Sequence, residues 1–132
     1  MRAMHRPGLV GVAGIALIAV DGLIHFSLFP GYFEYATYLG LLFLANTLGS
    51  VLSALGINTG ARWGWPLGAL SAGGAFVMYV VSRLVGLPGL PESERDWLDP
   101  QGVLSLIVEG LFVALYLWRV TPTTSGGGNR VR

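Results

Sequence analysis

Residues 9–29 read LVGVAGIALIAVDGLIHFSLF, an apolar run in which Asp21 and His25 are the only ionisable residues. A helix rises about 1.5 Å per residue, so about 20 apolar residues are enough to cross roughly 30 Å of hydrocarbon. Lipid offers the backbone no hydrogen-bond partner, and such a segment must therefore be helical. The stretch predicts a membrane-spanning helix whose two ionisable residues need partners or a function.

Three further stretches have the same length and apolar character, at residues 36–56, 63–86 and 102–118. Pro30 and Gly31 are expected to end the first helix, and residues 56–60 to form a turn between the second and third helices. Short connections make neighbouring helices antiparallel, which favours an up-down-up-down bundle. The sequence therefore predicts an all-α membrane protein with four transmembrane helices.

The composition agrees with this fold class, because 53% of the residues are hydrophobic and only 11% are charged. Soluble domains carry about 25% charged residues. Residues 1–121 are predicted to form a single transmembrane domain, and residues 122–132 a disordered cytoplasmic tail. Cysteine is absent, which excludes disulfides, thiolate metal ligands and cysteine nucleophiles.

The distribution of charge predicts the orientation of the helices. Six arginines fall at the two termini and in the second connection, namely Arg2, Arg6, Arg62, Arg119, Arg130 and Arg132. The other connections hold most of the acidic residues, namely Glu34, Glu92, Glu94, Asp96 and Asp99. The positive-inside rule then predicts that both termini are cytoplasmic. All eight basic residues are arginine, whose codons are rich in G and C, so we expect a multi-pass protein of a bacterial inner membrane.

Six polar residues inside the apolar stretches are the candidate site residues. They are Asp21, His25, Asn46, Tyr79, Arg83 and Glu109. Counting from the predicted helix ends places all of them in the outer half of the bilayer. The spacing of Asp21 and His25, and of Tyr79 and Arg83, is i,i+4, so each pair shares one helix face. No catalytic residue is assigned.

Three interpretations of this cluster remain open. In the first, Arg83 forms a buried ion pair with Asp21 or Glu109 that fixes helix register. In the second, the cluster is a ligand or metal site, because His25, Asp21 and Glu109 offer one imidazole and two carboxylates to a divalent cation. In the third, the same residues form a proton or quinone site.

Small residues recur every fourth position in three of the helices. They are Ala45, Gly49 and Ser53 in the second, Gly64, Gly68 and Ala72 in the third, and Gly110 and Ala114 in the fourth. This spacing lets helix backbones approach closely in lipid. It predicts tight packing within the chain or, alternatively, contacts with other membrane subunits or with a second copy.

Two functional classes follow from these patterns. The first is a non-enzymatic membrane module, either an accessory subunit or a binder of a small ligand or metal. The alternative is a membrane redox or transport component that uses the pocket formed by His25, Asp21 and Glu109. The expected surroundings are the lipid bilayer and other membrane proteins, and nothing in the sequence indicates nucleic-acid binding.

The second half of the chain resembles a known group of proteins. Residues 82–89, SRLVGLPG, are followed by Trp97-x-x-Pro100 and by residues 105–109, SLIVE. With His25 late in the first helix, this pattern is similar to small four-helix integral membrane proteins of actinobacterial type. The resemblance covers most of residues 20–118 and implies the four-helix architecture, but no activity.

Overall fold

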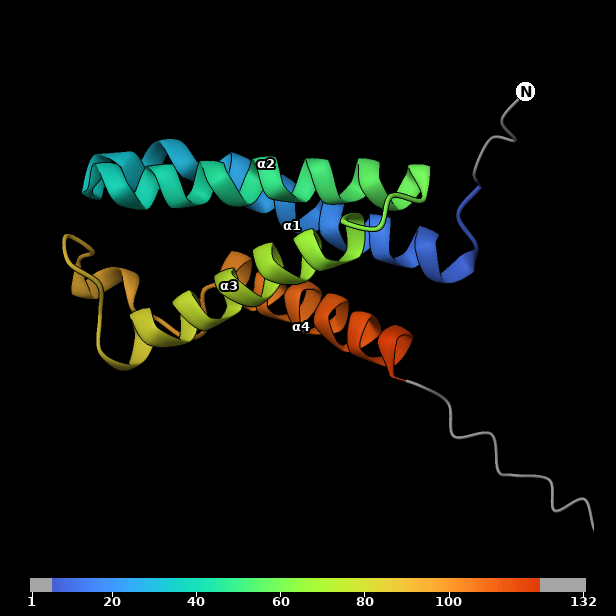
Figure 1. The fold of residues 1–132 in the computed structure, drawn as a ribbon. Coiled ribbons are helices and arrows are strands. Elements are labelled where there is room, and N and C mark those ends of the chain that lie inside the picture. Colours follow the sequence, from blue (N-terminus) through green and yellow to red (C-terminus); the bar gives the residue numbers. More distant parts are fainter. Residues whose placement is uncertain (1–5, 122–132) are drawn as a thin grey trace, which may run out of the picture.

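The computed structural model describes residues 6–121. Its helices are α1 (Leu9–Tyr35), α2 (Thr37–Thr59), α3 (Gly64–Leu84) and α4 (Pro100–Val120), with a short 3₁₀ helix, η1 (Glu92–Glu94), before α4 (Figure 1). No strand occurs within residues 6–121. Each of the four α-helices is long and apolar enough to cross a membrane, which confirms the predicted all-helical membrane class at this level.

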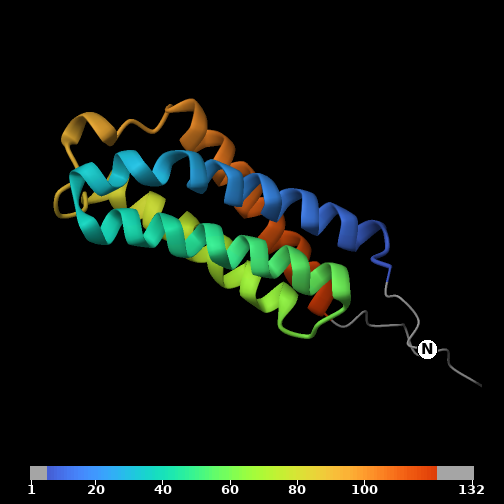
Figure 2. The same cartoon turned by 90° about the horizontal axis from the view of Figure 1, so that it is seen from above.

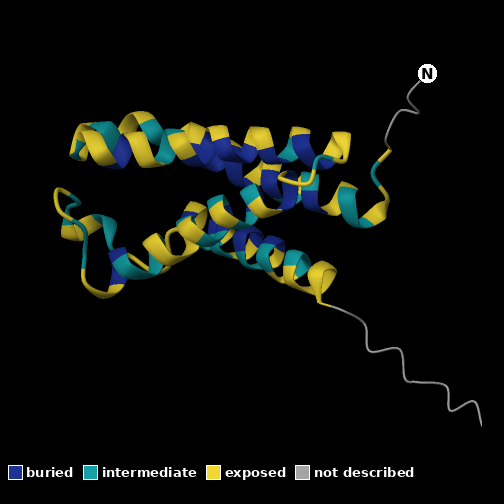
Figure 3. Cartoon of the chain, viewed as in Figure 1, coloured by how far each residue is buried: buried dark blue, intermediate teal, exposed yellow. Residues whose placement is uncertain are grey.

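The four helices pack in a ring. Each helix contacts the next along the chain, and α1 closes the ring against α4 (Figure 2). Within an 18-residue apolar segment of each helix, only 22–44% of the residues are buried. The outward faces therefore carry many exposed large hydrophobic side chains. Figure 3 shows exposed residues along all four helices. An apolar surface of this extent requires an apolar surrounding such as lipid.

The hydrophobic core lies at the end of the bundle near the α2–α3 turn. It is formed by Ile18, Ile57, Trp65, Ala72 and Phe112. The rings of Trp65 and Phe112 are stacked with their centroids 5.3 Å apart. These large side chains fill the space between α1, α3 and α4 in this part of the bundle.

Small residues bring α2 and α3 together beside this core. A Cβ atom at Gly64 would lie 2.6 Å from backbone atoms of Gly56 and Ile57, so the two backbones are in direct contact. The hydroxyl of Ser53 donates to the carbonyl oxygen of Gly64 over 2.7 Å. Ser53, Gly56 and Gly64 thus serve packing within the chain.

The first helix does not end at Pro30, as its sequence predicted, but continues to Tyr35. Proline removes one backbone donor, and transmembrane helices tolerate this loss when neighbouring segments stabilise the helix. Here the ring of Tyr32 stacks on that of Phe43 in α2 with centroids 3.9 Å apart. The ring of Phe33 also covers Gly40. These contacts hold the last turn of α1 against α2, and Ala36 alone connects the two helices.

The other helix ends differ from the prediction by a few residues. The second helix continues to Thr59, because the left-handed conformation that ends it (φ 76°) falls on Gly60 rather than earlier. The third helix ends at Leu84 and the fourth begins at Pro100. Asp99 caps the fourth helix, accepting from the backbone N–H of Gly102 over 2.9 Å. The predicted tail, 122–132, lies outside the described residues.

The segment 85–99 between α3 and α4 is held against the first two helices. The hydroxyl of Tyr38 donates to the carbonyl oxygen of Pro88 over 2.6 Å, and that of Tyr35 donates to the carboxylate of Glu94 over 3.0 Å. Toward this end of the bundle α3 diverges from the α1–α2 pair (Figure 1). The candidate site lies in this open half.

Candidate functional site

Asp21, His25 and Glu109 come together between α1 and α4. One potential ligand atom from each lies within 4.8 Å of the others. Nδ1 of His25 is 3.2 Å from Oδ1 of Asp21, and Nε2 is 3.9 Å from Oε1 of Glu109. Both carboxylates are only 1% exposed. The residues that the sequence singled out as a metal-ligating set are therefore neighbours in space.

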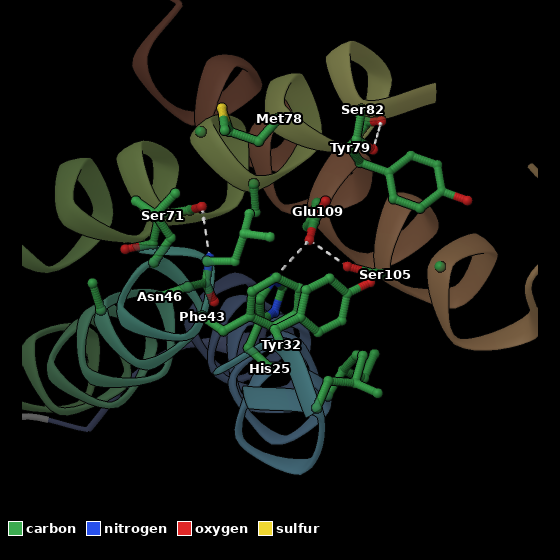
Figure 4. A pocket seen from close by; sticks show the side chains of 18 of the residues that line it. His25, Tyr32, Phe43, Asn46, Ser71, Met78, Tyr79, Ser82, Ser105 and Glu109 are labelled. Atoms are coloured by element: carbon green, nitrogen blue, oxygen red, sulfur yellow. Dashed lines mark hydrogen bonds and ion pairs between the residues drawn. The ribbon is translucent and has the colours of Figure 1, made fainter. Parts of the chain in front are cut away.

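The orientation of the His25 ring is set by its own helix. Nδ1 lies 2.9 Å from the backbone carbonyl oxygen of Asp21, which accepts a hydrogen bond from that nitrogen. With its hydrogen on Nδ1, the ring has a lone pair on Nε2. Nε2 faces Glu109, whose carboxylate also presents lone pairs (Figure 4). With the Glu109 carboxylate ionised, neither group can donate to the other in this arrangement.

The two carboxylates are incompletely satisfied. Among the described residues, neither Oδ1 of Asp21 nor Oε2 of Glu109 has a hydrogen-bond partner. Ser105, one turn before Glu109, donates its hydroxyl to Oε1. Burial of such oxygens as charged groups without a partner is costly, and a proton or a bound cation would compensate it.

Asn46 joins the cluster indirectly, through Ser50 one turn later in α2. The Ser50 hydroxyl lies 3.3 Å from Oδ1 of Asn46 and 3.4 Å from Oδ2 of Asp21. The amide nitrogen of Asn46 donates to the carbonyl oxygen of Ser71 in α3 over 2.9 Å. This chain of contacts connects α1, α2 and α3 around the base of the site.

The predicted ion pair of Arg83 with Asp21 or Glu109 is not formed. Nε of Arg83 donates to the backbone oxygen of Asp96 over 3.2 Å, and Nη1 donates to the Ser82 hydroxyl over 2.9 Å. The guanidinium also lies over the Tyr79 ring, 3.9 Å from its centroid. Arg83 sits in the last turn of α3, where the carbonyls of the following segment are within reach and replace a carboxylate.

A cavity of about 480 Å³ lies beside the cluster in the open half of the bundle. His25 and Glu109 line it (Figure 4), whereas Asp21 does not. Most of its wall is apolar and includes Leu28, Leu39, Leu42, Leu67, Leu70 and Met78. Leu87 and Leu90 of the α3–α4 segment close its outer end. Apolar walls with a few convergent polar groups are typical of small-molecule sites.

Three of the six candidate residues, Asp21, His25 and Glu109, lie directly together. Asn46 is connected to them through Ser50. Tyr79 and Arg83 belong to a separate group near the α3–α4 segment. Five of the six line the cavity, all but Asp21. The sequence reasoning missed Ser50, although its i+4 spacing from Asn46 was a usable signal. It also missed Tyr32 and Phe43, whose stacked rings line the cavity.

Comparison of the chain with family models, with curated proteins and with solved structures finds no match.

Proposed function

We propose that the protein is a small multi-pass membrane protein whose role is to bind a divalent cation at Asp21, His25 and Glu109. The observation that supports this most directly is the convergence of three buried groups, each with a potential ligand atom within 4.8 Å of the others. A divalent cation would neutralise both carboxylates and use the Nε2 lone pair at the same time. The hydrogen bond from Nδ1 to a backbone carbonyl is the support that metal-ligating histidines generally have.

The donor set narrows the choice of ion. One imidazole nitrogen with two carboxylates suits Zn²⁺ or Mn²⁺, whereas Mg²⁺ prefers an all-oxygen octahedral shell and keeps its water. Three protein ligands leave at least one coordination position open. We assign no catalytic residue, so the proposed role is that of a binding module or an accessory subunit.

The proposal includes an orientation in the membrane. We infer an up-down-up-down bundle with both termini in the cytoplasm of a bacterial cell, on the strength of the arginine distribution. Arg62 and Arg119 support this, because both border one hollow at the α2–α3 turn. The cation site then lies in the outer half of the membrane, nearer the acidic segment 92–99.

Thermal unfolding of the purified protein in detergent tests the cation site. The protein is stripped with EDTA, passed into EDTA-free buffer, and titrated with Zn²⁺, Mn²⁺ or Mg²⁺. Zn²⁺ or Mn²⁺ is expected to raise the melting temperature, since a ligand at 100 times its Kd contributes about 2.7 kcal/mol. His25→Ala and Glu109→Gln should lose this rise, and Mg²⁺ should give little.

His5→Ala is the matched control, because His5 is the only other histidine and belongs to no site proposed here. It should respond to the metal as the wild type does. An equal rise in wild type, His25→Ala and Glu109→Gln would rule out the proposed site. So would the absence of any rise in the wild type.

The alternative role, a redox or transport component, is supported by the contact of an imidazole with two carboxylates, a set that can relay protons. It predicts stability that is indifferent to Zn²⁺ and Mn²⁺. In that case, reconstituted vesicles should show proton movement that His25→Ala abolishes.

A further inference from the structure

The cavity beside the cation site points to a second ligand. We propose that it binds a neutral, lipid-soluble molecule whose head group carries a carbonyl or hydroxyl oxygen, with that oxygen completing the coordination of the cation. This inference rests on the proposed cation site and adds to it the class of molecule that the site serves.

The proposed cation site is open on one side only, the side that faces the cavity. His25 and Glu109 line the cavity, and Asp21 does not. A cation held by all three is therefore covered by protein on the Asp21 side and accessible from the cavity side. Because three protein ligands leave a coordination position free, that position faces the cavity.

Charge decides what kind of head group fits there. A divalent cation balances the two carboxylates, and His25 with its hydrogen on Nδ1 is neutral. A charged head group would then be uncompensated beside side chains that are 1% exposed, which is costly. A neutral oxygen donor contacts the cation without adding charge.

The walls fit an apolar body behind such a head group. The stacked rings of Tyr32 and Phe43 form a flat surface next to His25, whose ring centroid is 5.0 Å from that of Phe43. A planar conjugated head, such as a quinone ring, would lie well against this surface. Much of the remaining wall consists of leucine, isoleucine and methionine side chains, which suit an alkyl chain.

The cavity is also accessible from the surface that lipid would cover. Leu42 of α2 and Leu70 of α3 line the cavity and are 47% and 73% exposed, so its wall is continuous with the outer face of the bundle. In a bilayer this face contacts acyl chains. A lipid-soluble ligand can therefore enter sideways, without passing through water.

Gly74 provides a way to fill the cavity without touching the cation ligands. It lines the cavity, and a Cβ atom placed there would have nothing within 4 Å. Gly74→Phe should therefore occupy the space of the ligand's alkyl chain. Gly31→Phe is the matched control, because a Cβ at Gly31 also meets nothing within 4 Å and Gly31 does not line the cavity.

The experiment measures binding of a decyl-substituted benzoquinone to the detergent-purified protein, with Zn²⁺ and with EDTA. In Zn²⁺ the wild type and Gly31→Phe should bind it, and EDTA should weaken binding by about tenfold or more, as expected for losing a contact to a charged centre. Gly74→Phe should lose at least about tenfold in affinity. Decyltrimethylammonium, which is charged and has no oxygen, should bind more weakly than the quinone.

Two readouts separate this inference from the cation proposal. The Zn²⁺-dependent rise in melting temperature should persist in Gly74→Phe, which shows that the variant is folded and holds the ion. If Zn²⁺ stabilises the wild type but the quinone does not bind, or binds equally to Gly74→Phe, the second ligand is refuted and the cation site stands. If Zn²⁺ has no effect on stability or on quinone binding, both proposals fail.

Discussion

Nδ1 of His25 lies 2.9 Å from the backbone carbonyl oxygen of Asp21, one helical turn earlier in α1. The i,i+4 spacing places a side chain next to the carbonyl of the preceding turn, so the helix itself orients the ring. With its hydrogen directed to that oxygen, the ring offers Glu109 only the Nε2 lone pair. In the proposed function, a divalent cation between the histidine and the ionised glutamate takes lone pairs from both.

Replacing Glu109 with glutamine should stabilise the protein when no metal is present. The amide is uncharged, and its NH₂ group can donate to Nε2 of His25, which the carboxylate cannot. We expect Glu109→Gln in EDTA to gain roughly 1–3 kcal/mol in the free energy of unfolding, the usual cost of a buried unsatisfied group. Denaturant unfolding in detergent measures this. Glu92→Gln, at an exposed position, should change nothing. A Glu109→Gln protein less stable than the wild type in EDTA would show that the carboxylate is already compensated.

Arg83 and Glu109 should behave as independent residues. Arg83→Leu removes hydrogen bonds to Asp96 and Ser82 and should destabilise the protein by roughly 1–3 kcal/mol. Because Arg83 and Glu109 share no partner, the double variant with Glu109→Gln should equal the sum of the single effects within about 0.5 kcal/mol. A double-mutant cycle of unfolding free energies in EDTA tests this. A coupling energy well above that limit would show that Arg83 and Glu109 do interact as an ion pair.

The failed Arg83 prediction shows where sequence reasoning is weak. Depth and helix face correctly grouped Asp21, His25 and Glu109, because both follow from counting residues along a helix. One partner of Arg83 is the backbone oxygen of Asp96, in the segment 85–99. The positions of backbone carbonyls in such a segment cannot be inferred from residue types. The cavity could not be predicted from the sequence either, since it depends on how far α3 diverges from α1 and α2.

Helix number was predictable for a physical reason, and helix ends were less so. An apolar stretch of about 20 residues in lipid can only be helical, which settled all four helices. The end of α1 is decided by the stacking of Tyr32 on Phe43, a tertiary contact that outweighs the stop signal of Pro30. The cap at Asp99 was predictable because it is local.

Two glycines of α3 should respond oppositely to alanine. Gly64→Ala places a methyl group within 3 Å of the α2 backbone at Gly56, so the helices must separate, at a cost of roughly 1–3 kcal/mol. Gly74→Ala adds the same group in open space and should be neutral or stabilise by up to about 1 kcal/mol through higher helix propensity. The two variants differ only in position, so each is the other's control. Equal melting temperatures would mean that the Gly56–Gly64 contact is not close.

Cysteine labelling of intact bacterial cells should reveal the orientation of the bundle. The chain has no cysteine, so Ser93→Cys and Asn58→Cys each create a single exposed thiol, one in η1 and the other near the α2–α3 turn. Arg62 and Arg119 lie at the same end of the bundle as Asn58, and the positive-inside rule predicts that this end is cytoplasmic. A membrane-impermeant maleimide should therefore label Ser93→Cys in intact cells, and Asn58→Cys only after permeabilisation. The reverse pattern would invert the proposed orientation, and labelling of both in intact cells would exclude helices that span the membrane between them.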